Sequence, residues 1–390
     1  TRRYSVLEEG DLAVVTREGI RFYNEFAEPV EREILTADWD MEAAEKGGYP
    51  HFMLKEINEQ PAAITATVSP RVENGLPDLR IPELSDEKLR GIGTIHLVAC
   101  GTAMHAGMVG KSAIETLARV PAEVDIASEF RYRDPILNKN DLVIIISQSG
   151  ETADSLAALR LCKEKGVKTL GIVNVVGSSI AREADNVFYT LAGPEISVAT
   201  TKAYSCRLVA AYLLAMQFAK ARGEISDERF AQLVEEINTI PEKIEKILED
   251  KERLQWFASK VVNIKDAFFI GRGIDYAVGM EGSLKLKEIS YIHSEAYASG
   301  ELKHGTISLI EPGTLVIALG TYGPLFDKAM SNVIEVKARG ASVLALTTEN
   351  RREDLSSRVD GILTIPETEL PLLPLLGVVP LQLFAYYVAL

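Results

Sequence analysis

The sequence contains two similar copies of one long segment, and this internal duplication limits the possible folds more than any other feature of the chain. At a shift of 172 residues, LVACGTAMHAG (97–107) aligns with FIGRGIDYAVG (269–279), which places Gly101 on Gly273. VDIASEF and DLVIIISQSG align with EAYASGEL and GTLVIALGTY at the same shift. Two further segments pair in the same order after small slips, so chance is a poor explanation for the match.

Each copy alternates strand-like and helix-like segments. The strand-like segments are continuous apolar runs rich in Val, Ile and Leu, and segments of helix length separate them. This pattern is typical of parallel strands that are covered by helices on both faces. We therefore predict an α/β protein with two doubly wound parallel-sheet domains of similar topology.

The amino-terminal segment departs from this repeat. Residues 4–26 alternate apolar and polar side chains around the turn TREG, which predicts a β-hairpin. An isolated hairpin is marginal in water, so residues 1–47 are interpreted as the edge of another domain. The predicted boundaries are 1–47 for this remnant, 48–245 for the first α/β domain and 246–390 for the second.

Two stretches outside the repeat predict helices. HFMLKEINEQPAAITATV (51–68) is an amphipathic helix candidate that Pro61 interrupts. Residues 207–260 predict long helices, and SDERFAQLVEEI begins on a Ser-x-x-Glu-like cap at Ser226.

Composition excludes several functional classes. A net charge of −14 and a pI near 5.0 disfavour binding to nucleic acid or to an anionic membrane surface. The three cysteines form no CxxC pair and lie beside no histidine, which predicts reduced thiols, no zinc site and a cytoplasmic protein. Three prolines break the apolar run 371–390, which predicts buried core rather than a membrane span. The first residues show no secretory signal.

SQSGET (147–152) follows the apolar run DLVIII and precedes a helical segment. Ligands of open parallel sheets bind beyond the carboxyl ends of the strands, and a helix N-terminus there favours a phosphate. Hydroxyl and amide side chains add neutral donors, and CGTA (100–103) should converge nearby. The loop lacks the lysine of a nucleoside triphosphate site, so it predicts phosphate binding without triphosphate cleavage. The alternative is a simple helix cap, for which one serine or threonine suffices.

The equivalent loop of the second copy, LGTYG, lacks these donors, and the candidate catalytic groups lie instead in 281–306. On a helix, Glu281, Lys285 and Glu288 share one face. The alternative reading is an ion-paired surface, but the neighbouring apolar residues favour partial burial, in which a carboxylate can act as a base near neutral pH. His304 alone would more often be structural than catalytic.

Four segments together resemble the sugar-isomerase (SIS) domain pair of the glutamine–fructose-6-phosphate aminotransferases: SQSGETADSLAALR, SSIAREAD, VATTKAY and LKLKEISYIHSEAYASGELKHG. The resemblance covers about residues 50–390, and the last segment is its most specific part. YPHFMLKEINEQPAAI (49–64) is similar to this family's junction with an amino-terminal glutaminase domain. The hairpin before it then resembles the remnant of that domain.

The resemblance implies an enzyme that makes glucosamine 6-phosphate from fructose 6-phosphate and glutamine-derived ammonia. Glu288 would move a proton between C1 and C2, and Lys285 would be a second acid–base group. His304 would assist ring opening and reach the site of the neighbouring subunit, which implies a homodimer. No metal or redox cofactor is implied. The implied substrate-binding residues are Thr102, Ala103, Ser147, Gln148, Ser149, Thr152, Val198 and Ala199.

The sequence departs from the family in three places. It begins at Thr1 rather than at the glutaminase's cysteine nucleophile, so as given it is not expected to release ammonia from glutamine. It stops at Leu390, before a family tail whose lysine forms a Schiff base with the open-chain sugar. Ala103 stands where the family commonly has serine, which removes one possible hydroxyl contact.

Two other functions stay open at this point. A regulatory SIS protein would bind a phosphosugar without turnover, and it would keep residues 147–152 without needing Glu288 and His304 together. A deglycase or another sugar-phosphate isomerase of the same superfamily would differ in its product.

Overall fold

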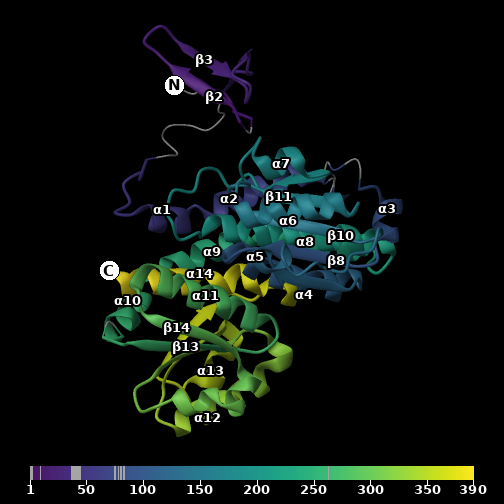
Figure 1. Ribbon diagram of the computed structural model, residues 1–390. Coiled ribbons are helices and arrows are strands. Elements are labelled where there is room, and N and C mark those ends of the chain that lie inside the picture. Colours follow the sequence, from purple (N-terminus) through teal and green to yellow (C-terminus); the bar gives the residue numbers. More distant parts are fainter. Residues whose placement is uncertain are drawn as a thin grey trace. The chain divides into compact units, whose positions relative to one another are not determined.

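The computed structural model describes residues 3–8, 10–36, 45–73, 76–77, 79, 81, 84–261 and 263–390, and the chain divides into two compact units, Thr1–Gly47 and Gly48–Leu390 (Figure 1). In the first unit, β2 (Leu12–Val15) and β3 (Ile20–Tyr23) form an antiparallel hairpin. Its turn closes where the backbone N–H and hydroxyl of Thr16 donate to the Gly19 carbonyl. The predicted hairpin is therefore present. Short strands complete this unit: β1 (Arg3–Tyr4), β4 (Pro29–Val30) and β5 (Leu35–Thr36).

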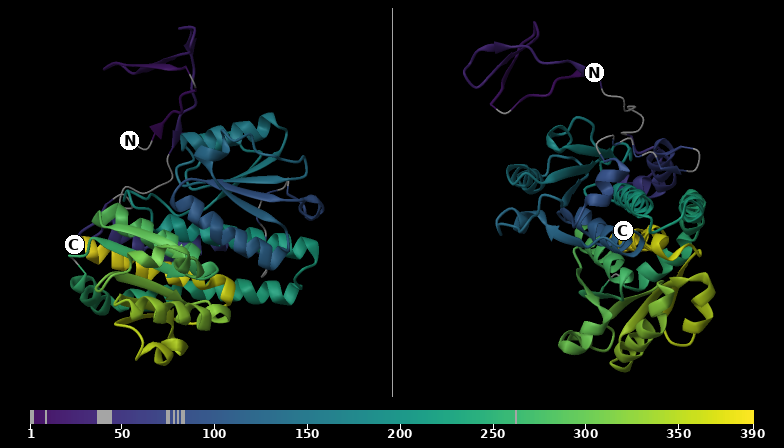
Figure 2. Two further views of the ribbon diagram at one scale, coloured as in Figure 1. Left: turned by 60° about the horizontal axis from the view of Figure 1, so that its bottom comes forward. Right: turned by 90° about the vertical axis from the view of Figure 1, so that its right-hand side faces the viewer.

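The second unit contains two five-stranded parallel sheets, one from each half of the repeat (Figures 1 and 2). The first sheet has the order β12-β11-β10-β8-β9, and the second has β14-β13-β15-β16-β17. The first contains β8 (Ile95–Ala99), β9 (Ala122–Ile126), β10 (Leu142–Ser147), β11 (Lys168–Val173) and β12 (Asn186–Tyr189). The second contains β13 (Asp266–Gly271), β14 (His293–Ala298), β15 (Leu315–Gly320), β16 (Ser342–Thr348) and β17 (Gly361–Ile365).

The two sheets have the same topology once β8 is matched to β13 and each later strand to its counterpart. Gly101 and Gly273, which the sequence alignment pairs, both begin a helix with a left-handed φ, of 54° and 58°. Only glycine adopts such a conformation without steric cost, so the same strand-to-helix turn requires glycine in both copies. The predicted pair of doubly wound α/β domains is confirmed.

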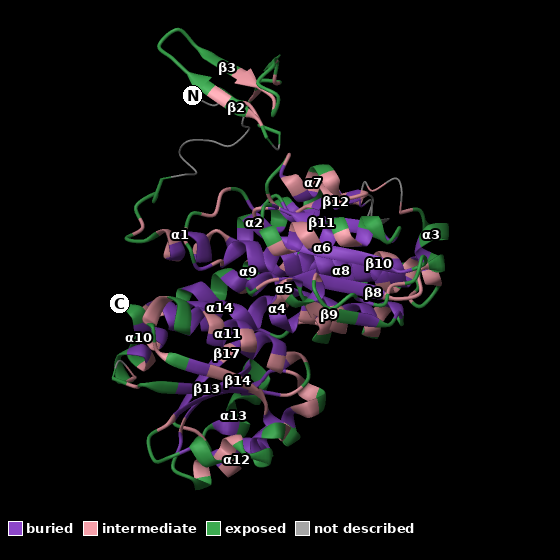
Figure 3. Ribbon diagram, in the orientation of Figure 1, coloured by how far each residue is buried: buried purple, intermediate pink, exposed green. Residues whose placement is uncertain are grey.

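A layer of helices lies between the two sheets, and one hydrophobic core joins both halves through it (Figures 2 and 3). Strand residues alternate between this shared core and an outer core: Leu97 and Phe269 face the middle, whereas Val98 and Phe268 face outward. The middle layer contains α4 (Thr102–Ala113), α8 (Lys202–Arg222), α9 (Asp227–Glu249), α11 (Ile274–Ser290) and α14 (Leu373–Ala389). Outer helices include α5 (Ala127–Phe130), α6 (Ala153–Glu164), α7 (Ser179–Glu183), α12 (Phe326–Ala338) and α13 (Arg352–Leu355).

The last helix, α14, occupies the middle of this layer. Residues 370–389 are long and apolar enough to cross a membrane by length and composition, but 89% of the most apolar window is buried inside the protein. The prediction that this run is buried core is therefore confirmed. Its apolar side chains pack against α11, α9 and α10 (Lys251–Lys260).

Two local predictions need correction. The helix predicted for 51–68 is broken at Glu59, not at Pro61, because Pro61 lies in the first turn of α2 (Gln60–Val68), where its missing N–H costs no hydrogen bond. The preceding helix is α1 (Phe52–Asn58). Ser226 does cap α9, and its hydroxyl accepts from the N–H of Arg229. The residue three positions after the cap is therefore an arginine, whereas a full capping box has glutamate or glutamine there. The predicted domain boundary at 245/246 stays a prediction; α9 runs through it.

Candidate functional site

The loop 147–152 follows the carboxyl end of β10 and leads into α6. Its neighbour in the sheet is β8, whose last residue Ala99 pairs with Ile146, so CGTA begins at the same level of the sheet. The structure thus brings the two predicted phosphate-binding loops to adjacent strand ends, each leading into a twelve-residue helix. The unpaired N–H groups of these helix starts favour an anion.

Hydrogen bonds within the loop hold it in shape. The Ser147 hydroxyl accepts from the Gly150 N–H at 3.0 Å and lies 3.0 Å from the Thr152 hydroxyl. The Ser149 hydroxyl accepts from the Glu151 N–H at 3.1 Å. Gly150 has a φ of +67°, and a Cβ there would lie 2.0 Å from the Ser178 hydroxyl oxygen. Thr152 makes no side-chain cap bond to α6, so a cap alone does not account for this loop.

Lys285 on α11 is fully buried and connects the two halves of the repeat. Its ammonium group donates to the Thr102 hydroxyl at 3.1 Å and lies 3.4 Å from Glu281 Oε1 and 2.6 Å from Glu288 Oε2. Thr102 begins α4 in the first half and also donates to Glu281 at 3.1 Å. The alternative of an ion-paired surface is therefore wrong for Glu281 and Lys285, which have no solvent exposure.

Glu288 lies at the open end of this cluster. Its side chain keeps 32% of its surface exposed, whereas its partner Lys285 has none. The buried ammonium keeps one carboxylate oxygen in place, and the exposed part of Glu288 is free to meet a solute. A buried lysine needs such partners, because an unpaired charge in the interior is strongly unfavourable.

The remaining predicted residues take different positions. Ala103 is buried in the first turn of α4, and Gln148 is partly buried beside Ser147. Ala199 is buried, whereas the Val198 side chain is 97% exposed. His304 is exposed on the 3-10 helix η4 (Ser299–His304) and contacts neither Lys285 nor Glu288 through any described hydrogen bond or ion pair. The structure leaves Val198 and His304 apart from the cluster.

Sequence reasoning missed several polar residues that hold these groups. His105 on α4 lies with Nδ1 2.8 Å from Glu281 Oε2, deep in the junction between α4 and α11. The Glu56 carboxylate accepts from the N–H groups of Ile196 and Ser197, just before Val198, and burial raises its pKa. Glu281 itself was predicted from its spacing of four to Lys285. His105 and Glu56 gave no local signal, since their partners lie far away in the chain.

In the second copy, a carboxylate of the protein itself occupies the equivalent loop. Asp275 aligns with Ala103, and one of its carboxylate oxygens accepts from the backbone N–H groups of Thr321 and Tyr322 at 3.0 and 3.1 Å. The Thr321 hydroxyl donates to the other oxygen. Thr321 and Tyr322 align with Ser149 and Gly150 of the first loop. A carboxylate therefore occupies the N–H groups that a phosphate would need in the second half. Burial raises the pKa of Asp275 to about 6.

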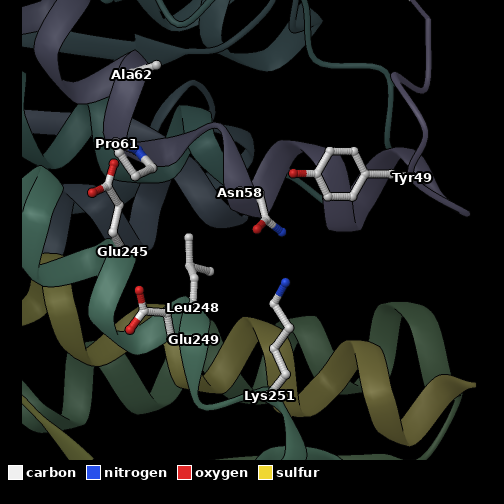
Figure 4. Close-up of a pocket in the computed structure, with 8 residues that line it drawn as sticks. All are labelled: Tyr49, Asn58, Pro61, Ala62, Glu245, Leu248, Glu249 and Lys251. Atoms are coloured by element: carbon white, nitrogen blue, oxygen red, sulfur yellow. The ribbon is translucent and has the colours of Figure 1, made fainter.

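An open pocket lies elsewhere, between α1–α2 and the facing ends of α9 and α10 (Figure 4). Asn58 and Lys251 point into it from opposite sides. None of the catalytic or substrate-binding residues predicted from the sequence lines this pocket. It is therefore not the candidate site, which comprises the ends of β8 and β10 and the junction of α4 with α11.

Comparison with a protein-family model matches the SIS domain to residues 88–217 and 260–390. The chain is 52% identical to the glutamine--fructose-6-phosphate aminotransferase [isomerizing] of Caldanaerobacter subterraneus and 53% identical to that of Clostridium tetani. Each alignment covers 100% of this chain and 64% of the relative, so the chain spans about two thirds of the length of these proteins.

Solved structures give the same picture. The C-terminal domain of glucosamine-fructose-6-phosphate aminotransferase from Francisella tularensis superposes with a TM-score of 0.85 and 39% identity, over 88% of this chain and 97% of that one. Tagatose-6-phosphate ketose/aldose isomerase from Escherichia coli superposes with a TM-score of 0.69 at 18% identity, over 87% and 92%, which shows a shared fold alone.

Proposed function

The chain belongs to the family of SIS-domain proteins, and on this premise we propose that it is the isomerase part of a glutamine–fructose-6-phosphate aminotransferase. Its substrate is fructose 6-phosphate, its nitrogen comes from ammonia, and its product is glucosamine 6-phosphate. High identity to aminotransferases of this name along the whole chain supports this proposal.

In this proposal the substrate phosphate binds at the ends of β8 and β10. Backbone N–H groups and the hydroxyls of Ser147, Ser149 and Thr152 donate to it, with the Gln148 amide beside them. Thr102, Ala103 and the segment of Val198 and Ala199 line the sugar. The adjacent strand ends and the braced loop support this placement.

Glu288 is the proposed base. Ammonia and the C2 carbonyl of the open-chain ketose form an imine, and Glu288 takes a proton from C1 and returns it to C2. The C1 hydroxyl becomes the aldehyde of the aldose amine as its proton leaves. Lys285, 2.6 Å from Glu288, holds the carboxylate and is a second acid–base group. A positioned base of this kind contributes about 10²–10⁴-fold to a rate.

Further parts of the proposal concern the assembly. His304 assists ring opening, and its exposed position supports a role at the site of a second subunit in a homodimer. Residues 1–47 are the last part of an amino-terminal glutaminase domain, which supplies ammonia in the parent chain, and the linker that follows it. The exposed apolar side chains of Val15 and Ile20 support a covering partner there. The protein acts in the cytoplasm and binds neither nucleic acid nor membrane.

The single observation that carries the proposal is the contact from Thr102 through Lys285 to Glu288. It joins the end of the phosphate-binding strand in one half to the proposed base in the other. A phosphate at the first loop and a base beside C1 of the same sugar require such a junction.

The test follows proton exchange in D₂O by NMR, with fructose 6-phosphate and ammonium added. The chain should incorporate deuterium at C2 of the aldose product. Glu288→Gln should lower the exchange rate by about 10²–10⁴-fold while fructose 6-phosphate binding is retained. Glu164→Gln, on the exposed end of α6, is the matched control and should change neither.

Two outcomes would contradict the proposal. Binding without any exchange by the parent chain would favour a phosphosugar sensor. Exchange that leads to a product other than glucosamine 6-phosphate, or that Glu288→Gln leaves intact, would favour a deglycase or another sugar-phosphate isomerase.

A further inference from the structure

His96 in β8 is a buried histidine without a hydrogen bond. The residue is 5% exposed, and neither ring nitrogen has a hydrogen-bond partner among the described residues. Nδ1 lies 3.5 Å from Glu123 Oε2, and Nε2 lies 3.5 Å from Asp141 Oδ2. Burying a polar group without a hydrogen-bond partner is energetically unfavourable unless another group or ligand binds to it.

Two carboxylates share a face with this imidazole. Glu123 on the edge strand β9 is the register partner of His96, and Asp125 follows two residues later on the same side of the strand. One ligand atom from each of the three residues lies within 4.8 Å of the others. The Glu123 side chain is 59% exposed, so the cluster opens to solvent at the sheet edge.

The second copy of the repeat shows that the fold does not need this polar group. The equivalent register pairs are Phe268 with Glu295 and Ile270 with Tyr297. Phe268 and Tyr297 pack against each other there, with ring centroids 6.1 Å apart. An aromatic pair thus occupies the place that His96 and Asp125 take in the first copy.

We propose that His96, Glu123 and Asp125 bind a divalent transition-metal ion such as Zn²⁺ at the edge of the first sheet. Imidazole nitrogen and carboxylate oxygen are both zinc ligands, and a site with three protein ligands leaves the fourth position to water. Asp141 Oδ2 lies 3.5 Å from Nε2, so with a metal on Nδ1 the Nε2–H would donate to this carboxylate. The Asn138 N–H donates to the same oxygen, Asp141 Oδ2, at 2.7 Å and holds it in place.

Arg133 is the group that the ion displaces. Its guanidinium lies 2.7 Å from Asp125 Oδ2 and is 49% exposed, so it can turn into solvent. A divalent cation also carries more charge than one guanidinium, so it attracts the Asp125 carboxylate more strongly.

This site is separate from the proposed phosphosugar site. His96 lies four residues before the CGTA loop, about 13 Å along the strand at a rise of ~3.3 Å per residue. The ion would link the edge strand β9 to β8, and it takes no part in the proton transfer.

The test titrates ZnSO₄ into the EDTA-treated chain at pH 7.5 by calorimetry, and follows the thermal unfolding midpoint with and without zinc. The chain should bind one equivalent and unfold at a higher temperature. Glu123→Gln should remove both effects, and its exposed position leaves the fold intact. Asp141→Asn should weaken binding about 10–100-fold.

A double variant and a control complete the experiment. The double variant His96→Phe with Asp125→Tyr reproduces the second copy's aromatic pair. It should fold, should not bind zinc and should show no shift of the unfolding midpoint with zinc. His293→Gln removes an exposed histidine 3.7 Å from Glu295 on β14, the equivalent edge strand, and should bind zinc like the parent. Equal zinc binding by the parent and Glu123→Gln, or no binding by the parent, would overturn the proposal.

Discussion

At the scale of single residues, the junction between the two halves depends on a fully buried lysine. Lys285 has carboxylates at 3.4 and 2.6 Å and a hydroxyl at 3.1 Å, so its charge is matched within the protein. The desolvation that this charge suffers is offset only while all three partners remain.

Removing the Lys285 charge should destabilise the protein strongly. Lys285→Met leaves Glu281 buried without its cation, and the free energy of unfolding should fall by about 3–5 kcal/mol in urea titrations. Lys287→Met removes an exposed lysine of the same helix and should change it by less than ~0.5 kcal/mol. Equal changes in the free energy of unfolding for the two variants would show that the ion pairs and hydrogen bond of Lys285 do not stabilise the protein.

Asp275 should make stability depend on pH. Its pKa is about 6 when folded and near 3.8 otherwise, so the folded state holds the proton more tightly. The contribution to stability is complete below about pH 4 and is lost as pH rises through about 6. Relative to Asp275→Asn, the parent's free energy of unfolding should therefore fall by up to about 3 kcal/mol between pH 4 and pH 7.5.

The parent and Asp275→Asn share all other carboxylates. The titration of those groups therefore cancels in the difference between the two free energies of unfolding. A difference that stays constant with pH would mean that the N–H groups of Thr321 and Tyr322 keep the carboxylate charged throughout.

At the scale of elements, the same strand-to-helix unit has two outcomes. In the first half the loop after β10 is held by hydrogen bonds among its own serine and threonine hydroxyls and N–H groups, whereas in the second half the Asp275 carboxylate from α11 accepts from the N–H groups of the loop after β15. The two loops thus differ both in their own donors and in the residue at the first turn of the preceding helix, Ala103 in one copy and Asp275 in the other.

Gly150 should be essential to the open loop. In Gly150→Ala the new Cβ meets the Ser178 hydroxyl at 2.0 Å and the φ of +67° becomes strained, so the loop must move. Fructose 6-phosphate affinity should fall at least tenfold by calorimetry. Gly166→Ala has a similar φ of +72° but open space around the Cβ, and it should leave the affinity unchanged. Equal affinities in both variants would contradict phosphate binding at this loop.

At the scale of the whole molecule, the duplicated halves share one core. Both sheets present alternate residues to the same helical layer, and α14 at the end of the chain lies within it. Neither half can expose its inner face to water without losing this shared burial.

Residues 48–390 should therefore unfold as one cooperative unit, with the same midpoint as the whole chain. The shared core is built from residues of the second unit, Gly48–Leu390. Differential scanning calorimetry of 48–390 should show a single transition. Two separated transitions would mean that the halves do not stabilise each other.

Much of the fold was predictable because its signals are local. Apolar runs, helix-length spacers and the alignment of Gly101 with Gly273 indicate two parallel sheets without knowledge of any contact. The strand-to-helix position of the loop 147–152 was predictable for the same reason, and its role as a phosphate site stays a prediction. The break at Glu59 was missed because proline is tolerated in a helix's first turn.

What required the folded chain is every pairing between distant segments. The burial of Lys285, its hydroxyl partner Thr102, and His105 beside Glu281 depend on α4 meeting α11 across the two halves. The closing of the second loop by Asp275 and the cluster around His96 also depend on which strands lie side by side. Local sequence sets backbone preferences and burial patterns, whereas charge pairing depends on distances that only tertiary packing creates.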